Sequence, residues 1–284
     1  MNCLADFDRR DGWFLAILVP LLIAVYAGII PALVVDWGED PNYSHGFLVP
    51  LISGWFVWQR RFELKAAAIR PANAGLAVIF GSLALLVVGT AGTEYFTMRS
   101  SLVFLLAGIV LYLFGWAVLK ILALPIGFLL FMVPLPYIVY DAAAFPLKLF
   151  ISKVSVFVLK AMGVIVWREG NIIMFPETIL EVADACSGLR SLMSLAALAV
   201  ALAFLSQKTA IKRTLLILSA LPIAIFTNML RVIATGFLAQ YYGAAAAEGF
   251  FHEFAGMAVF VLAMVLLFVT GAVLRKFGTM DKEG

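Results

Sequence analysis

Apolar residues occupy long blocks of the chain, and short polar connections separate the blocks. A helix needs roughly 20 apolar residues to cross the hydrocarbon core of a bilayer, and the blocks approach or reach that length. The pattern therefore predicts a bundle of about eight membrane-spanning helices. The least distinct boundary between two blocks lies near Lys120, where almost no polar residues separate the fourth block from the fifth. The expected spans are residues 13–35, 44–58, 73–91, 100–118, 119–139, 187–206, 213–237 and 254–274.

The connections differ in charge, and the difference predicts the orientation. The loop 36–42 is acidic, whereas basic residues follow the second, sixth and eighth blocks. Lys and Arg collect in the cytoplasmic loops of membrane proteins. We therefore expect both termini in the cytoplasm. The basic residues are Arg60, Arg61, Lys65, Arg70, Lys208, Lys212, Arg213, Arg275 and Lys276.

The segment 140–186 is expected to stay outside the membrane. Its apolar part, 145–167, is long enough to suggest a further span, but that crossing would move the later basic loop outside. It also carries three lysines, and each would cost about 2.5–3.5 kcal/mol at the bilayer centre. An amphipathic helix on the outer surface avoids both problems. The stretch 171–182 has apolar residues and a Pro-Glu break, which favours short extended structure.

The composition agrees with lipid as the main solvent. The 284 residues are 64% hydrophobic and 13% charged, with a mean hydropathy of +1.06, whereas a soluble domain has roughly a quarter charged residues. The net charge of +3 is too small to indicate nucleic-acid binding. We predict an all-α membrane protein that forms one integral membrane domain over residues 1–284.

Two cysteines occur, Cys3 and Cys186, so no disulfide framework or CxxC motif is possible. Cys186 lies where the outer loop enters the sixth block, beside Asp184 and Ser187. A helix N-terminus lowers the pKa of a thiol, and Arg190 follows one turn later on the same face. A lone cysteine in a membrane helix is more often inert, but the polar neighbours here argue against an apolar pocket.

A second polar group lies inside the seventh block. Arg231 is placed about 9 Å below the outer end of that block, with Asn228 and Thr235 one turn away on the same face. An ionisable residue within a span is costly and usually has a functional partner. The alternative is a snorkelling arginine that anchors the helix end.

A third group opens the eighth block, where His252 is followed by Glu253 and Gly256. Gly256 lies one turn below His252 and would allow another helix to approach the imidazole. The HExxH zinc motif fails because position 256 is glycine, which argues against a metalloprotease. By itself, this histidine would more often be an interfacial residue than a catalyst.

Cys186, Arg231 and His252 come from separate segments but reach a similar depth on the outer side of the predicted topology. Acyl transfer through a thiol needs a thiolate nucleophile, a proton donor for the leaving amine and positive charge for the oxyanion. These three side chains can supply those roles, and the chemistry needs no metal or organic cofactor.

Four motifs resemble the signatures of the exosortase/archaeosortase family, in order over about residues 40 to 275. They occur as Tyr43-Ser44-His45-Gly46-Phe47-Leu48-Val49-Pro50, Ala185-Cys186-Ser187-Gly188-Leu189-Arg190-Ser191, Asn228-Met229-Leu230-Arg231-Val232 and His252-Glu253-Phe254-Ala255-Gly256.

This resemblance implies a sortase-like cysteine transpeptidase in a bacterial inner membrane, with its site on the extracytoplasmic side. The implied substrates are secreted proteins that end in a Pro-Glu-Pro-like motif, a transmembrane helix and a basic tail. Transfer would go to an unidentified acceptor nucleophile. The catalytic roles carry over to Cys186, Arg231 and His252. Supporting or substrate-binding roles are expected for Arg190, Ser187, Asn228 and His45.

Three other functions remain as alternatives. A transporter could use the intramembrane Arg231 and Asn228, but the polar residues cluster at one leaflet and no inverted repeat is visible. A thiol oxidoreductase lacks a resolving cysteine, because Cys3 is predicted on the opposite side from Cys186. A non-catalytic scaffold is the third.

Overall fold

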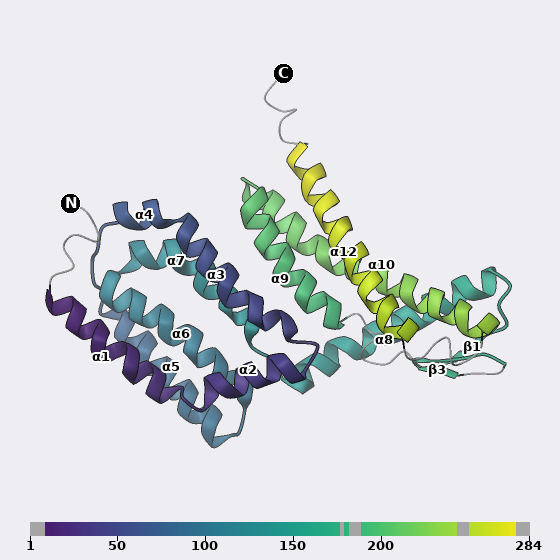
Figure 1. Cartoon of the computed structure of the whole chain (residues 1–284), viewed down its shortest axis with the longest axis horizontal. Helices are drawn as coiled ribbons and strands as arrows, with labels where there is room; N and C mark the ends of the chain where they lie inside the picture. The colour runs from purple at the N-terminus through teal and green to yellow at the C-terminus, as the bar shows by residue number, and fades with distance from the viewer. Residues whose placement is uncertain (1–8, 177–178, 182–188, 243–249, 277–284) are drawn as a thin grey trace. The chain divides into compact units, whose positions relative to one another are not determined.

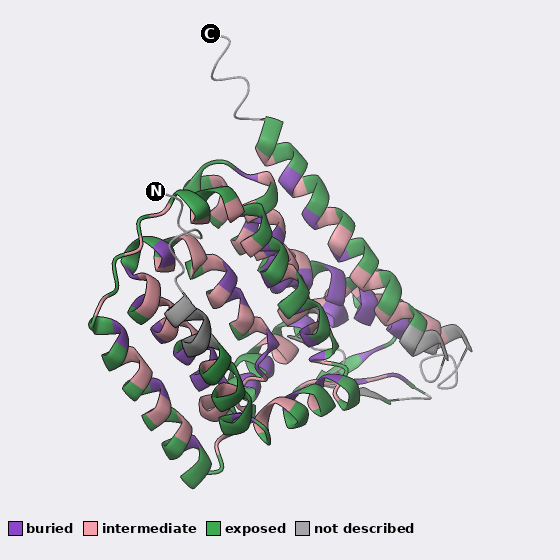
Figure 2. Cartoon of the chain, turned by 60° about the vertical axis from the view of Figure 1, so that its left-hand side comes forward, coloured by how far each residue is buried: buried purple, intermediate pink, exposed green. Residues whose placement is uncertain are grey.

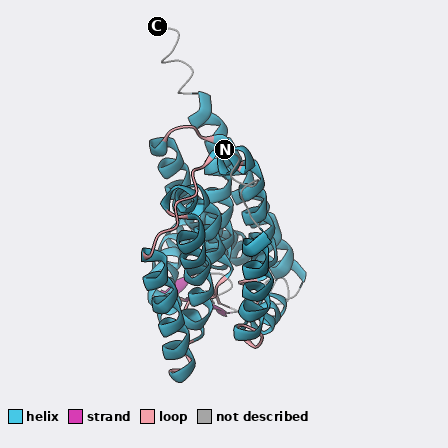
Figure 3. Cartoon of the chain, turned by 90° about the vertical axis from the view of Figure 1, so that its left-hand side faces the viewer, coloured by secondary structure: helices cyan, strands magenta, loops and turns pink. Residues whose placement is uncertain are grey.

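The computed structural model describes residues 9–176, 179–181, 189–242 and 250–276. Most of this described chain is helical, and its strands form one small sheet (Figure 3). The prediction of a helical, polytopic membrane protein agrees with this structure. The chain divides into two compact units, Met1–Pro136 and Tyr137–Gly284.

The first unit is made of helices joined by short turns (Figure 1). Helices α5 and α6 form an antiparallel hairpin in which Gly75 faces Tyr112 and Gly108 faces Ile79. Such small residues allow two backbones to approach closely in a membrane. The described elements are α1 (Arg9–Val25), α2 (Ile29–Glu39), η1 (Ser44–Phe47), α3 (Leu48–Gln59), α4 (Arg61–Ala66), α5 (Ala74–Ala91), α6 (Tyr95–Phe114), α7 (Trp116–Phe128) and η2 (Leu129–Met132).

The first predicted span, 13–35, is broken rather than continuous. Helices α1 and α2 meet at a bend of 59°. At the break, the Tyr26 hydroxyl lies 2.8 Å from Ser101 Oγ on α6. Further along α2, Asp36 pairs with the buried Arg99 of α6 at 2.6 Å. Contacts with α6 at the bend and further along α2 therefore fix the direction of α2.

The boundary between the fourth and fifth spans lies at Gly115, five residues before Lys120. Gly115 has a φ of +84°, which L-residues with a side chain rarely adopt. A Cβ there would also collide with the Arg70 carbonyl. The sharp turn therefore needs glycine, and α6 begins correspondingly early, at Tyr95. Glu94 caps it by accepting hydrogen bonds from the Phe96 and Thr97 N–H groups.

Helix α10 is central to the second unit, because α8, α9 and α12 all pack against it. Leu216 of α10 faces Gly271 of α12, and Arg231 faces Gly256, so these two helices run antiparallel. The described helices are α8 (Tyr137–Ala161), α9 (Leu189–Ser206), α10 (Ala210–Tyr242) and α12 (Phe250–Lys276). The buried core between α9, α10 and α12 consists of Leu195, Ala199, Ala203, Leu216, Ala220, Ala224, Ala263 and Leu267.

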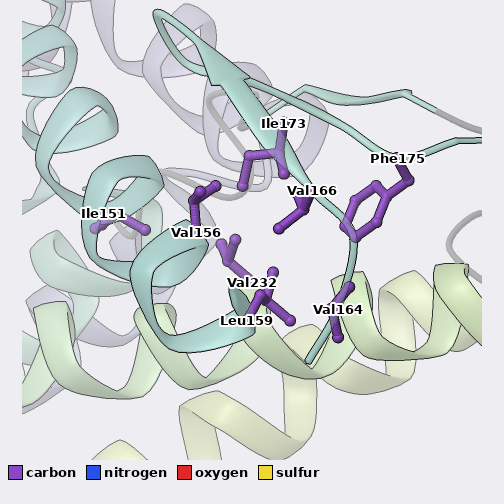
Figure 4. Packing of buried hydrophobic residues seen from close by; sticks show 8 residues of the cluster. All are labelled: Ile151, Val156, Leu159, Val164, Val166, Ile173, Phe175 and Val232. Carbon is purple, nitrogen blue, oxygen red and sulfur yellow. The ribbon is translucent and has the colours of Figure 1, made fainter. Parts of the chain in front are cut away.

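A three-stranded antiparallel sheet follows α8 in the order β1–β2–β3. Its strands are β1 (Trp167–Glu169), β2 (Ile172–Met174) and β3 (Ile179–Glu181). The expectation of extended structure within 171–182 is thus confirmed for β2 and β3. Figure 4 shows the apolar cluster that joins α8, the sheet and α10: Ile151, Val156, Leu159, Val164, Val166, Ile173, Phe175 and Val232.

Exposed residues occur along the helices of the described chain (Figure 2), and many of them are large and apolar. By length and composition, α5, α6, α8, Ala210–Leu238 of α10 and Phe254–Lys276 of α12 could each cross a membrane. The bent α1–α2 pair makes a sixth if it is one span, and Trp116–Met132 and Leu192–Ser206 are shorter apolar helices. This establishes a multi-pass membrane protein. The count of eight spans and the orientation remain predictions.

The number of spans, eight or nine, depends on whether α8 crosses the membrane. One face is buried through Tyr140, Ala144 and Ile151, whereas Lys153 and Lys160 are exposed. The exposed lysines suit a helix at a membrane surface, and Phe150 and Phe157 are exposed beside them. Its length and hydropathy also permit a span.

We predict that both ends of α8 are extracytoplasmic. In a variant without Cys3 and Cys186, single cysteines at Tyr137 and Met162 should both react with an impermeant maleimide in intact cells. A cysteine at Lys208, in the predicted cytoplasmic loop, should react only after permeabilisation. Labelling of positions 137 and 162 from opposite sides would show that α8 crosses the membrane.

Candidate active site

Arg231 is buried between helices, although it carries a permanent charge. Its side chain on α10 is 8% exposed. The guanidinium Cζ lies 3.4 Å, and its two terminal nitrogens 3.3 and 3.5 Å, from the position that a Cβ on Gly256 would occupy. The guanidinium therefore packs against the backbone of α12 at its glycine. The described neighbour of Gly256 is Arg231 of α10, and the predicted approach of a helix to the His252 imidazole stays a prediction.

The polar residues near Arg231 form a buried stripe on α10. Thr227, Asn228 and Thr235 are all buried, at the one-turn spacings that place them on the same face as Arg231. The Thr227 hydroxyl donates to the Ile223 carbonyl at 2.9 Å, so its polarity is satisfied within the helix. Asn228 and Arg231 therefore lie on one buried face of α10.

The Arg231–Gly256 contact lies near the end of the bundle opposite to the basic residues. Along α10, Arg231 is about 27 Å from Arg213, and Gly256 is about 28 Å from Arg275 along α12, at 1.5 Å per residue. The hydrocarbon core of a bilayer is about 30 Å thick. If both basic ends lie at one surface, the contact comes close to the other surface.

The remaining predicted residues of the site are only partly described. Cys186 and Ser187 lie outside the described residues, as does Cys3. Arg190 is in the first turn of α9 and His252 in the first turn of α12, but their side chains lie outside the described part of the chain. His252 is one helical turn before Gly256, which places it on the helix face that meets Arg231.

The sheet that leads to Cys186 is attached to α10 close to Arg231. The Phe175 ring and Leu159 approach Gly236, where a Cβ would lie 3.0 and 3.1 Å from their nearest atoms. Val232, the residue next to Arg231, belongs to the same buried cluster as Ile173 and Phe175. In sequence, β3 ends five residues before Cys186. Strand β2, which pairs with β3, and the helix with Arg231 thus share one core.

His45 belongs to the first unit, where it forms a hydrogen bond with a backbone carbonyl. Its Nε2 donates to the Phe131 carbonyl at 3.1 Å, because that oxygen can only accept. Trp37 Nε1 donates to the Met132 carbonyl at 2.8 Å, and the Tyr43 hydroxyl accepts from the Leu135 N–H at 3.2 Å. We name Trp37, Tyr43 and His45 the α7 clamp, since they bind the backbone that follows α7, in η2 and at Leu135.

Sequence reasoning missed the clamp and the Asp36–Arg99 ion pair. Arg99 stands one residue outside the predicted fourth span, so it was not recognised as a buried charge. Its 5% exposure and its bond to Asp36 show a structural role between α2 and α6. The sequence did contain a signal for this ion pair. Asp36 belongs to the acidic loop 36–42, and Arg99 lies at the boundary of the predicted fourth span.

The transmembrane exosortase family model matches residues 37–269. The chain belongs to the exosortase family. The match includes both units and all four motifs, and it supports a membrane transpeptidase-type function in protein sorting. A comparison with curated proteins and one with solved structures give no significant match.

The contact between Arg231 and Gly256 predicts a graded response to side-chain size. Gly256→Ala should reduce processing moderately, since the guanidinium must shift by a few tenths of an ångström. Gly256→Val should cost about a hundredfold, the usual effect of a displacement near 1 Å. The measurement is cleavage of a reporter with a sorting signal at matched membrane levels. Gly81→Val is the control, because a Cβ there meets nothing within 4 Å. Full activity of Gly256→Val would refute the contact's importance.

The α7 clamp predicts that His45 contributes to stability rather than to chemistry. His45→Ala and Trp37→Phe each remove one donor and should lower the thermal midpoint in detergent by about 2–4 °C, the equivalent of roughly 1 kcal/mol. His45→Gln, which retains a donor, should recover part of the loss. Processing per folded molecule should change little. Loss of processing in His45→Ala at an unchanged thermal midpoint would instead place His45 in the reaction.

Proposed function

We propose that the chain is a membrane cysteine protease and transpeptidase that cleaves the C-terminal sorting signals of secreted proteins. The signals are of the Pro-Glu-Pro type followed by a transmembrane helix and a basic tail. The observation that carries the proposal is the buried Arg231, packed against α12 one turn from His252 in a chain of the exosortase family. A cation in that position can stabilise an oxyanion.

Each proposed catalytic residue has one role. Cys186 is the nucleophile, Arg231 binds the oxyanion and His252 is the general acid. Burial strengthens a cation's interaction with a developing negative charge, because the local dielectric constant is low. Ser187 and Arg190 flank the nucleophile in the chain, and Asn228 lies beside Arg231 on α10. These three residues support the thiolate, the substrate or the arginine.

The reaction proceeds through a thioester. The Cys186 thiolate attacks the scissile carbonyl carbon, and the C–O π electrons move to oxygen beside Arg231. The intermediate collapses, the C–N bond breaks, and the departing amine takes a proton from the His252 imidazolium. An acceptor nucleophile then attacks the thioester and gives its proton to the imidazole. The thiolate leaves, and water as the acceptor would give hydrolysis.

The proposed topology places this chemistry on the extracytoplasmic side of the inner membrane. Eight spans, with both termini inside and α8 on the outer surface, bring the starts of α9 and α12 to the outer side. The substrate's own transmembrane helix then presents the signal at the same level. We propose that residues 1–284 form one integral membrane domain.

The nucleophile is tested by Cys186→Ser, which should abolish processing while the protein accumulates in the membrane. A hydroxyl is a much poorer nucleophile than a thiolate without a strong activating base. The matched control, Cys3→Ser, should be silent. His252→Ala should also lose at least about a hundredfold in rate. The readout is uncleaved reporter beside each variant, and normal cleavage by Cys186→Ser would end the cysteine mechanism.

The oxyanion role predicts that Arg231→Lys is not a conservative change. A planar guanidinium offers two parallel donors, whereas an ammonium is a compact and strongly hydrated point charge. We expect a loss of roughly a hundredfold or more in the rate of reporter cleavage, as for removal of an oxyanion-hole donor. Thermal midpoints would establish that the variant is folded. Turnover close to that of the unmodified enzyme would reduce Arg231 to a structural anchor.

A further inference from the structure

We propose that the outer edge of β3 binds the sorting signal as an added, extended strand. The proposal rests on the function proposed above, because it describes how the same site holds its substrate. The occupant is the peptide segment of the signal that precedes its transmembrane helix. The interaction is between main chains, and it aligns the peptide for attack by Cys186.

The order of the sheet leaves β3 at an edge. Strand β2 lies between β1 and β3, and within the described ranges β3 pairs with β2 alone. An edge strand presents main-chain N–H and C=O groups on its outer side, which makes it a template for a further strand. Peptide recognition by strand addition uses these groups for affinity and neighbouring pockets for specificity.

The sheet is held firmly enough to act as a template. Ile173 of β2 is 0% exposed and Phe175 is 3% exposed. Both pack in the cluster with Leu159 of α8 and Val232 of α10 (Figure 4). Phe175 also approaches Gly236, one turn beyond Val232. Two helices therefore support β2, and β2 in turn supports β3.

The position of β3 in the chain selects it over the other edge. Glu181 ends β3 five residues before Cys186, so the nucleophile lies within about 17 Å of the strand's end. The other edge strand, β1, ends 17 residues before Cys186 at Glu169. It is also two strand spacings, about 9.5 Å, from β3. A peptide on β3 can therefore place a bond a few residues away beside the thiolate.

A Pro-Glu-Pro motif is compatible with this mode of binding. Successive residues of a strand direct their N–H and C=O groups to opposite sides. The glutamate can therefore pair with β3 while both prolines face away, where their missing N–H groups cost nothing. Proline is tolerated in edge strands in this orientation.

Disulfide trapping tests the pairing directly. In a Cys3→Ser, Cys186→Ser background, single cysteines replace Ile179, Leu180 or Glu181. A reporter protein ending in a Pro-Glu-Pro motif, a transmembrane helix and a basic tail carries one cysteine at successive positions of its motif and flanks. Residues directly opposite in paired strands have Cβ atoms about 4.5–5.5 Å apart, so cross-linking should rise and fall with a period of two. Cysteines at Trp167, Arg168 and Glu169 of β1 are the matched control.

Synthetic peptides provide a second measurement on the unmodified enzyme. N-methylation of the glutamate amide in a Pro-Glu-Pro peptide should lower kcat/KM roughly tenfold, the equivalent of one hydrogen bond. N-methylation two residues after the glutamate should have a similar effect, whereas N-methylation three residues after it, on the side to which the prolines belong, should be tolerated.

The outcomes separate this inference from the proposed function. Cleavage of the reporter by the unmodified enzyme, with alternating cross-links at β3 and none at β1, supports strand addition. Three outcomes would overturn strand addition and leave the cysteine chemistry intact, provided that the unmodified enzyme cleaves the reporter. They are uniform cross-linking, absence of cross-linking at β3, and preferential cross-linking at β1. Absence of cleavage by the unmodified enzyme contradicts the proposed function and this inference together.

Discussion

A permanently charged side chain among apolar helices must be held by specific packing, because a charge at membrane depth costs several kcal/mol. In this chain that constraint falls on Arg231. The guanidinium lies against the backbone of α12 at Gly256, where any larger residue would displace it. The antiparallel packing of α10 and α12 sets the position of this contact, and His252 lies one helical turn before Gly256 in the sequence of α12.

The rest of the second unit is arranged along α10. Near the basic end, alanines such as Ala199, Ala220 and Ala263 are almost fully buried and allow α9, α10 and α12 to approach closely. Near the other end, α8 and the sheet pack against Val232 and the neighbouring turn. One helix thus joins a compact membrane bundle to the segment that carries the chain toward Cys186.

The sequence predicted the helices better than their ends and better than the contacts between distant segments. Long apolar blocks determine where helices form, since lipid-exposed backbone must satisfy its own hydrogen bonds. The break in the first block involves Tyr26 and Ser101, which are 75 residues apart, and local pattern does not contain that information. The bond from His45 to the Phe131 carbonyl is similar, because a backbone acceptor leaves no signature in sequence. Arg231 and Gly256 could each be selected as a candidate site residue from the sequence, because an intramembrane charge and a glycine one turn from a histidine are both unusual. The contact between the two residues could not be predicted in this way. The chemistry of Cys186 and His252 remains a prediction.

The central claim is that a thioester forms on Cys186 during processing, and covalent trapping tests it most directly. The purified protein, reconstituted into lipid vesicles, would be mixed with the sorting-signal reporter. The reaction would be quenched in acid, and the products would be analysed by peptide mass spectrometry. The account predicts an adduct of the cleaved reporter on the peptide that contains Cys186, which neutral hydroxylamine releases as a hydroxamate. Two results together would contradict the account. Protein whose Cys186 is quantitatively alkylated would cleave the reporter fully, and no hydroxylamine-sensitive adduct would be detected at any time.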